Sequence, residues 1–77
     1  MEKKFDELNL HQKMEIIIRE MVEKEVPFKD AQKEFEKIYI EMTSKKYKGN
    51  KTKMAKALGI HRNTLHHKTK FLKIREK

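Results

Sequence analysis

The chain has 77 residues and a formal net charge of +8 at pH 7, with 42% charged and 36% hydrophobic residues. A chain of this length forms one small domain and is too short to bury a large core. It contains no cysteine, which excludes disulfides and thiolate metal sites. No apolar run approaches the roughly 20 residues of a membrane span, so we expect a soluble cytoplasmic domain without membrane contact.

The first predicted helix begins after Asn9. Asn9 and Gln12 have the spacing of a capping box, in which each side chain accepts a hydrogen bond from the other residue's backbone N–H. From Leu10 to Val22, hydrophobic residues recur every three or four positions and form one stripe. Pro27 then marks the start of a new helix, because proline suits the first helical turn.

The second predicted helix covers Phe28–Tyr47 and ends at Lys48-Gly49. Its apolar residues also form one face, with Ile40 beside it. The two stripes offer more apolar surface than the short C-terminal helices can cover. We therefore expect two copies of the chain to pair these helices in a four-helix bundle, with an ordinary monomeric core as the alternative. The expected dimer-interface residues are Leu10, Met14, Ile17, Ile18, Met21, Phe35, Ile38, Tyr39 and Met42.

The segment 49–72 is typical of a helix-turn-helix. Asn50 is a good N-cap residue for one helix, and Gly59 can end that helix in a left-handed conformation. The second helix is expected from about His61 to Leu72. Two helices that cross steeply need a small residue at their approach and a large apolar residue between them, and Ala55 and Leu65 have this spacing around the glycine.

Basic residues are concentrated in the C-terminal half. Residues 1–42 hold 8 Lys or Arg and 11 Asp or Glu, a net charge of −3, whereas residues 43–77 hold 12 Lys or Arg and a single acid, a net charge of +11. A solvated lysine-rich surface normally keeps acids interspersed among its bases. Their near-absence after residue 42 favours a polyanionic partner, which for a helix-turn-helix means nucleic acid.

The string GNxTxxAxxLGIxRNTLxxK, which ends at Lys68, resembles the C-terminal helix-turn-helix of the Fis family. That family includes the nucleoid protein Fis and the DNA-binding domains of NtrC-type, sigma-54-dependent activators. A weaker similarity, FKDAQKEFEKIYI, extends back to Phe28 and is closer to the NtrC-type domains. The resemblance implies one all-α, Fis-type DNA-binding domain over residues 1–77, with dimerisation helices at 9–47 and the helix-turn-helix at 49–72.

The same resemblance implies a function. It is sequence-specific binding of double-stranded DNA by a homodimer, as the DNA-binding domain of a bacterial sigma-54-dependent, NtrC-like transcription activator in the nucleoid. A free-standing, Fis-like nucleoid protein that bends DNA is the alternative within the family. Dimers of helix-turn-helix proteins place two recognition helices about 34 Å apart, so a pseudo-palindromic site is expected.

Candidate base-reading residues lie in and just before the second helix of the motif. The N-terminus of a recognition helix enters the major groove first, and an arginine there can donate two hydrogen bonds to guanine. In the family, the arginine that matches Arg62 reads guanine, and neighbouring positions lie at the DNA. The candidate base-reading residues are His61, Arg62, Asn63, Thr64, His66 and His67.

Candidate phosphate-binding residues lie at the start of the first helix of the motif and along the second. Backbone N–H groups and the helix dipole favour an anion at a helix N-terminus, where family members grip phosphate. The lysines are expected to position the protein on DNA rather than to specify sequence. The candidate phosphate-binding residues are Asn50, Lys51, Thr52, Lys53, Lys68 and Lys70.

Four positions depart from the family pattern. Asparagine or serine is usual at His61, and histidine is expected to be a poor cap for the recognition helix. Arginine or lysine is usual at His66 and His67, so the preferred DNA sequence is expected to differ. Leucine is usual at Thr69, and we expect Phe71 and Leu72 to replace its contribution to the core.

Other functions have less support in the sequence. His61 and His66 are five residues apart and sit badly on one helical face, whereas zinc needs three or four convergent ligands, so no metal or cofactor is expected. There is no Gly-rich phosphate loop and no cysteine nucleophile, so we expect neither an enzyme nor a small-molecule substrate. Two alternatives remain open: an RNA-binding or annealing module, and a structural dimerisation module with a basic tail.

Overall fold

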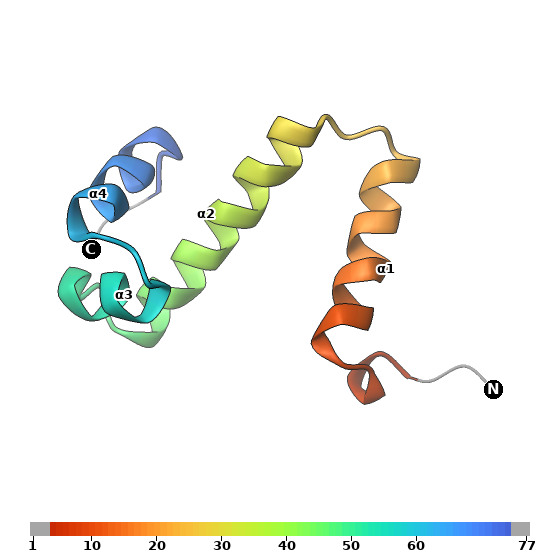
Figure 1. Cartoon of the computed structure of the whole chain (residues 1–77), viewed down its shortest axis with the longest axis horizontal. Helices are drawn as coiled ribbons and strands as arrows, with labels where there is room; N and C mark the ends of the chain where they lie inside the picture. The colour runs from red at the N-terminus through yellow and green to blue at the C-terminus, as the bar shows by residue number, and fades with distance from the viewer. Residues whose placement is uncertain (1–3, 75–77) are drawn as a thin grey trace. The chain divides into compact units, whose positions relative to one another are not determined.

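The computed structural model describes residues 4–74 and is entirely helical across them, without a strand. It contains a short 3-10 helix followed by four α-helices (Figure 1). This confirms the all-α class that the sequence predicts. Within the described residues, no helix is long and apolar enough to cross a membrane. In chain order the elements are η1 (Phe5–Glu7), α1 (Leu10–Glu23), α2 (Phe28–Lys46), α3 (Lys51–Leu58) and α4 (Arg62–Phe71).

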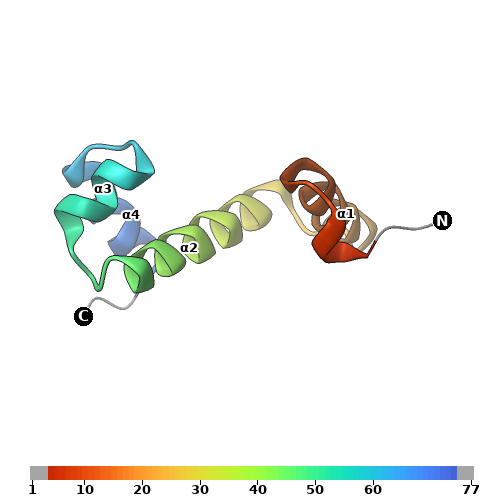
Figure 2. The same ribbon diagram turned by 90° about the horizontal axis from the view of Figure 1, so that it is seen from below.

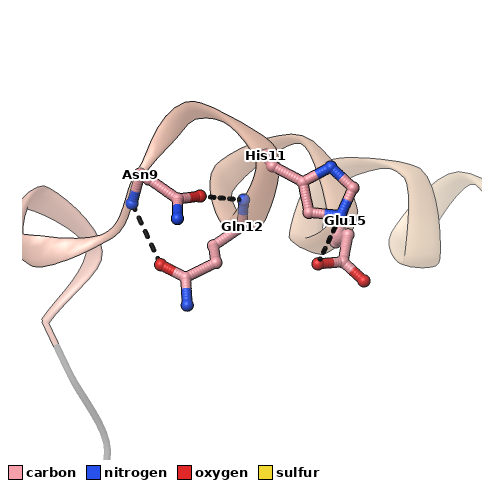
Figure 3. A network of polar contacts seen from close by, with 4 residues as sticks. All are labelled: Asn9, His11, Gln12 and Glu15. Carbon is pink, nitrogen blue, oxygen red and sulfur yellow. Dashed lines mark hydrogen bonds and ion pairs between the residues drawn. The ribbon is translucent and has the colours of Figure 1, made fainter.

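The chain forms two compact units, of which the first ends at Ala31 and the second begins at Gln32. The first unit contains α1, which begins with the predicted capping box. The backbone N–H of Gln12 donates to Asn9 Oδ1 at 2.8 Å, and the N–H of Asn9 donates to Gln12 Oε1 at 3.0 Å (Figure 3). In the same turn, His11 Nε2 lies 3.2 Å from Glu15 Oε1. The box satisfies N–H groups that have no partner within the helix.

All four α-helices end with the same backbone motif. A residue with a positive φ angle follows each helix, and the next N–H donates to the carbonyl five residues earlier, which is the Schellman arrangement. The positive-φ residues of these four motifs are Glu25, Lys48, Gly59 and Lys73, and Gly49, directly after Lys48, also has a positive φ. The hydrogen bonds, of 3.0–3.1 Å, run from Val26 to Met21, Gly49 to Ser44, Ile60 to Ala55, and Ile74 to Thr69.

The core of the second unit lies between α2, α3 and α4. Its buried hydrophobic members are Ile40, Met54, Ala55, Leu65, Leu72 and Ile74. Leu65 is fully buried, and the small Ala55 is 5% exposed, as the helix-turn-helix spacing predicts. Both views show α3 and α4 beside the C-terminal half of α2 (Figure 1, Figure 2). This core holds α4 so that its opposite face meets solvent.

Ile60, in the turn between α3 and α4, is partly buried and packs against the core. One sequence-based expectation about this core is corrected. Phe71 is 68% exposed and does not replace the missing leucine. Leu72 is buried in the core, and so is Ile74, which lies beyond the end of α4. Thr69 is itself buried, and its hydroxyl donates to the Leu65 carbonyl at 2.7 Å, so its polar group is satisfied within the helix.

Candidate nucleic-acid interface

The first turn of α3 combines a capped helix N-terminus with basic residues. Asn50 Oδ1 accepts a hydrogen bond from the Lys53 N–H at 3.1 Å, so this side chain acts as the N-cap that the sequence predicts. Thr52 and Lys53 are exposed and Lys51 is half-buried. There is no acidic residue in this turn. The end of α3 therefore offers N–H groups and positive charge to an anion.

The turn between α3 and α4 depends on the backbone freedom of Gly59. Its φ angle is 69°, in the left-handed region that glycine adopts without steric strain. A Cβ built at this position would have no heavy atom within 4 Å. The requirement for glycine is therefore conformational rather than a matter of space. This turn sets the direction in which α4 leaves α3.

His61 caps α4. Its Nδ1 accepts a hydrogen bond from the backbone N–H of Asn63 at 3.1 Å, and its own backbone is extended. The expectation that histidine would cap this helix poorly is corrected, because the ring nitrogen takes the place of the usual side-chain oxygen. The Nδ1 atom must carry no proton to accept this bond, so Nε2 is the ring atom left for an external partner.

The structure places the candidate base-reading residues on or beside one exposed helix. Leu65 and Thr69 form the buried side of α4. The candidate base-reading positions on α4 lie on other faces of the helix and are exposed. The rings of His66 and His67 are 6.0 Å apart, centroid to centroid. Contact of these side chains with bases stays a prediction. The exposed candidates are His61, Arg62, Asn63, Thr64, His66 and His67.

The candidate phosphate-binding lysines of α4 lie in different environments. Lys70 is exposed. The ammonium group of Lys68 instead forms an ion pair with Glu36 Oε1 of α2, at 2.5 Å. Sequence reasoning missed Glu36, since the two residues are 32 positions apart and no local spacing connects them. One turn further along, Lys33 Nζ lies 5.2 Å from the centroid of the Phe71 ring.

The candidate interface carries positive charge on every helix of the motif. Neither α3 nor α4 contains an acidic residue. Across residues 4–74, no group of three or more His, Cys, Asp or Glu side chains could hold a metal ion. The two helices therefore expose hydrogen-bond donors and cations, which suit a polyanionic surface.

The predicted dimer-interface residues are exposed in the single chain, except Met21, which is half-buried. Leu10 of α1 is 82% exposed and Met42 of α2 is 67% exposed. On α2, the rings of Phe35 and Tyr39 lie 5.6 Å apart, centroid to centroid. Contact of the predicted dimer-interface residues with a second copy of the chain stays a prediction.

Comparison with known proteins gives one match. The model of a family described as "Bacterial regulatory protein, Fis family" matches residues 31–70, just over half of the chain. The matched segment covers most of α2, all of α3 and all but the last residue of α4. No curated protein and no solved structure matches the chain.

Proposed function

Because this chain belongs to the Fis family of bacterial regulatory proteins, whose helix-turn-helix serves DNA binding, we propose that it is a homodimer that reads a pseudo-palindromic site in double-stranded DNA. The observation that carries the proposal is the exposed N-terminal turn of α4. It presents Arg62, Asn63 and Thr64 on a helix anchored by the fully buried Leu65. A helix of this kind enters the major groove with its first residues against base edges.

In this proposal the residues of the motif divide between two roles. Arg62 reads guanine through two hydrogen bonds to O6 and N7, and its neighbours on α4 contact adjacent bases. Thr52, Lys53 and Lys70 contact phosphates and fix the position of α4 in the groove. Asn50 contributes by capping α3, which keeps the N–H groups of that helix aimed outward.

Dimerisation is proposed through the exposed apolar faces of α1 and α2. Burial of these stripes against a second copy removes apolar area from water, which is favourable at roughly 25 cal/mol per Å². The two-fold axis of such a dimer relates two recognition helices, so the DNA site is expected to be an inverted repeat with half-sites about one turn apart.

The biological setting that we propose is the DNA-binding domain of a sigma-54-dependent, NtrC-like transcription activator in the bacterial nucleoid. It rests on the similarity of residues 28–40 to that class. A free-standing nucleoid protein that bends DNA is the alternative. An RNA-binding module has less support, because Tyr47 is partly buried against the core, which leaves Phe71 as the exposed ring of the basic half among the described residues.

Selection of tight binders from a random double-stranded DNA pool, at about 150 mM salt, tests the proposal. We expect enrichment of one inverted repeat with half-sites about one helical turn apart. Strong binding without enrichment would favour the nucleoid protein, and preference for single-stranded RNA would favour the annealing module. Absence of all nucleic-acid binding would leave a dimerisation module.

The same selection with two variants tests the division of roles. Arg62→Ala is expected to relax preference at one base pair of each half-site, with a loss of about 1–3 kcal/mol of discrimination there. Lys53→Ala is expected to weaken binding to all duplexes alike. If both variants lowered affinity equally and left the selected sequence unchanged, the assignment of Arg62 as a reader would be wrong.

A further inference from the structure

Helices α2 and α4 are held together by polar contacts at two successive turns. Lys68 pairs with Glu36, and Lys33 lies over the ring of Phe71. A step of three residues along α2 is matched by a step of three residues back along α4, so the two helices run antiparallel where they meet. Ile40 and Leu65 continue this line into the core.

The ion pair between Lys68 and Glu36 is better shielded than the pair between Lys24 and Glu20. The side chains of Lys68 and Glu36 are 38% and 31% exposed, whereas those of Lys24 and Glu20 on α1 are 70% and 67% exposed. Partial burial reduces screening by water and salt, so the first pair is held more firmly than an ordinary surface pair.

Glu36 also brings a negative charge to a helix-turn-helix whose own helices have none. Because α3 and α4 contain no acid, the carboxylate of Glu36 comes from outside the helix-turn-helix to meet a cation of α4. Lys53 and Lys70 are exposed and can meet a phosphate directly. Lys68 must first leave the Glu36 carboxylate, which is itself a charged acceptor for its ammonium group.

We propose that Glu36 is a positioning residue that holds Lys68 against α2 and keeps it out of the phosphate-binding set. This inference rests on the proposed DNA-binding function and adds a residue of α2 to it. Glu36 thereby lowers the sequence-independent part of the affinity, since each phosphate that a lysine neutralises contributes to binding of every duplex. It also ties the end of the recognition helix to the helix that is proposed to dimerise.

The test compares full-length Glu36→Gln with full-length Glu34→Gln. Both changes remove one negative charge from α2 and keep the size of the side chain. Glu34 is exposed and lies about 200° around the helix from Glu36, away from α4. Long-range effects of net charge on DNA binding are therefore equal in the two variants. Binding to one fixed duplex is measured between about 50 and 300 mM salt, and circular dichroism checks the fold.

For Glu36→Gln we expect affinity about threefold to tenfold higher than for Glu34→Gln at 100 mM salt. The slope of log affinity against log salt should be steeper by about 0.9 for each added phosphate contact, or about 1.8 for a dimer. A purely structural role for Glu36 would leave this slope unchanged. In a Lys68→Gln background, the additional effect of Glu36→Gln should disappear.

A second readout needs no DNA. In the free chain, Lys68 should react faster with an amine-acylating reagent in Glu36→Gln than in the unmodified protein or Glu34→Gln, as followed by mass spectrometry. Equal reactivity would overturn the proposed hold on Lys68. Faster acylation without a change in affinity or slope relative to Glu34→Gln would overturn the effect on DNA binding alone. An unmodified chain that binds no duplex would overturn both this inference and the proposed function.

Discussion

At the start of α4 the His61 side chain takes the place of the asparagine or serine expected there. The cap bond from the Asn63 N–H to Nδ1 requires a ring nitrogen without a proton. Asparagine or serine would cap the helix through a side-chain oxygen instead. The histidine therefore changes the atom that accepts the cap bond and keeps the cap itself.

We predict that His61→Ala, which removes the accepting nitrogen, lowers the free energy of unfolding by about 0.5–2 kcal/mol, the contribution of a side-chain cap. His61→Asn, whose amide oxygen can accept the same bond, should keep most of that stability. The measurement is denaturant unfolding of the unmodified chain and of both variants at one fixed pH.

Since both variants remove the same imidazole ring, its other contributions to stability cancel when the two variants are compared. His61→Ala should therefore be less stable than His61→Asn. Equal stability of the two variants would mean that a side-chain cap at this position contributes nothing measurable to the stability of α4.

Residue-scale features were the least predictable from the sequence. The cap residue Asn50 and the inward positions Ala55 and Leu65 follow from local spacing, and the structure confirms their burial or bonding. The ion pair between Glu36 and Lys68 does not follow from local spacing, because it depends on how two separate helices pack. The exposure of Phe71 has the same cause, since its place on the helix relative to α2 cannot be read from periodicity.

At the scale of elements, three of the four helix ends carry a steric strain that the end of α3 avoids. The left-handed residue after each helix is glycine only at Gly59; after α1 it is Glu25, with a φ angle of 55°. A residue with a side chain is strained there by roughly 1–2 kcal/mol, whereas glycine is not. Glycine at this position would relieve the strain, but part of this stabilisation is offset because glycine also has more conformational freedom in the unfolded chain.

Glu25→Gly is therefore expected to stabilise α1 by about 0.5–1 kcal/mol. Glu23→Gly, the same change at the last residue of α1, is expected to destabilise it by less than about 1 kcal/mol, since glycine is a poor helix former. Thermal unfolding followed by far-ultraviolet circular dichroism measures both. A gain of stability for Glu25→Gly and a loss for Glu23→Gly would support the Schellman motif at this helix end. Equal losses of stability for the two variants would contradict it.

The order and bounds of the elements could be predicted well, because caps and turn residues mark them. The predicted helices differ from α1, α2, α3 and α4 by about one residue at each end. Side-chain packing is harder to predict than helix bounds. The sequence pattern places Ile40 beside the apolar stripe of α2, yet it is the buried residue of that helix. Ile74 was missed because it follows the helix end, where the Schellman turn folds it back onto the core.

For the whole molecule, the separation of charge along the chain matches a separation of tasks. The acidic first half carries the exposed apolar stripes, and the basic second half carries the helix-turn-helix. Net positive charge would oppose association of two copies if it were spread evenly. Its concentration beyond residue 42 leaves the proposed dimerisation surface free of that repulsion and gives each subunit a strongly basic DNA-binding half.

Ile17→Glu tests the proposed dimer. Ile17 is 49% exposed in the single chain, so the variant should fold. A carboxylate at this position would be buried without a partner in the dimer, which costs several kcal/mol, and two-fold symmetry applies the cost to both subunits. Sedimentation velocity at micromolar concentration should show a dimer for the unmodified chain and a monomer for this variant.

Arg19→Gln is the matched control for Ile17→Glu. It changes the net charge by the same single unit at an exposed position of α1, about 200° around the helix from Ile17. It should remain a dimer. On DNA, Ile17→Glu should still recognise a single half-site but lose the tight binding to the inverted repeat, because each monomer then binds alone. A dimer that survives Ile17→Glu would place the subunit interface elsewhere than on α1, and the requirement for an inverted repeat would need another source.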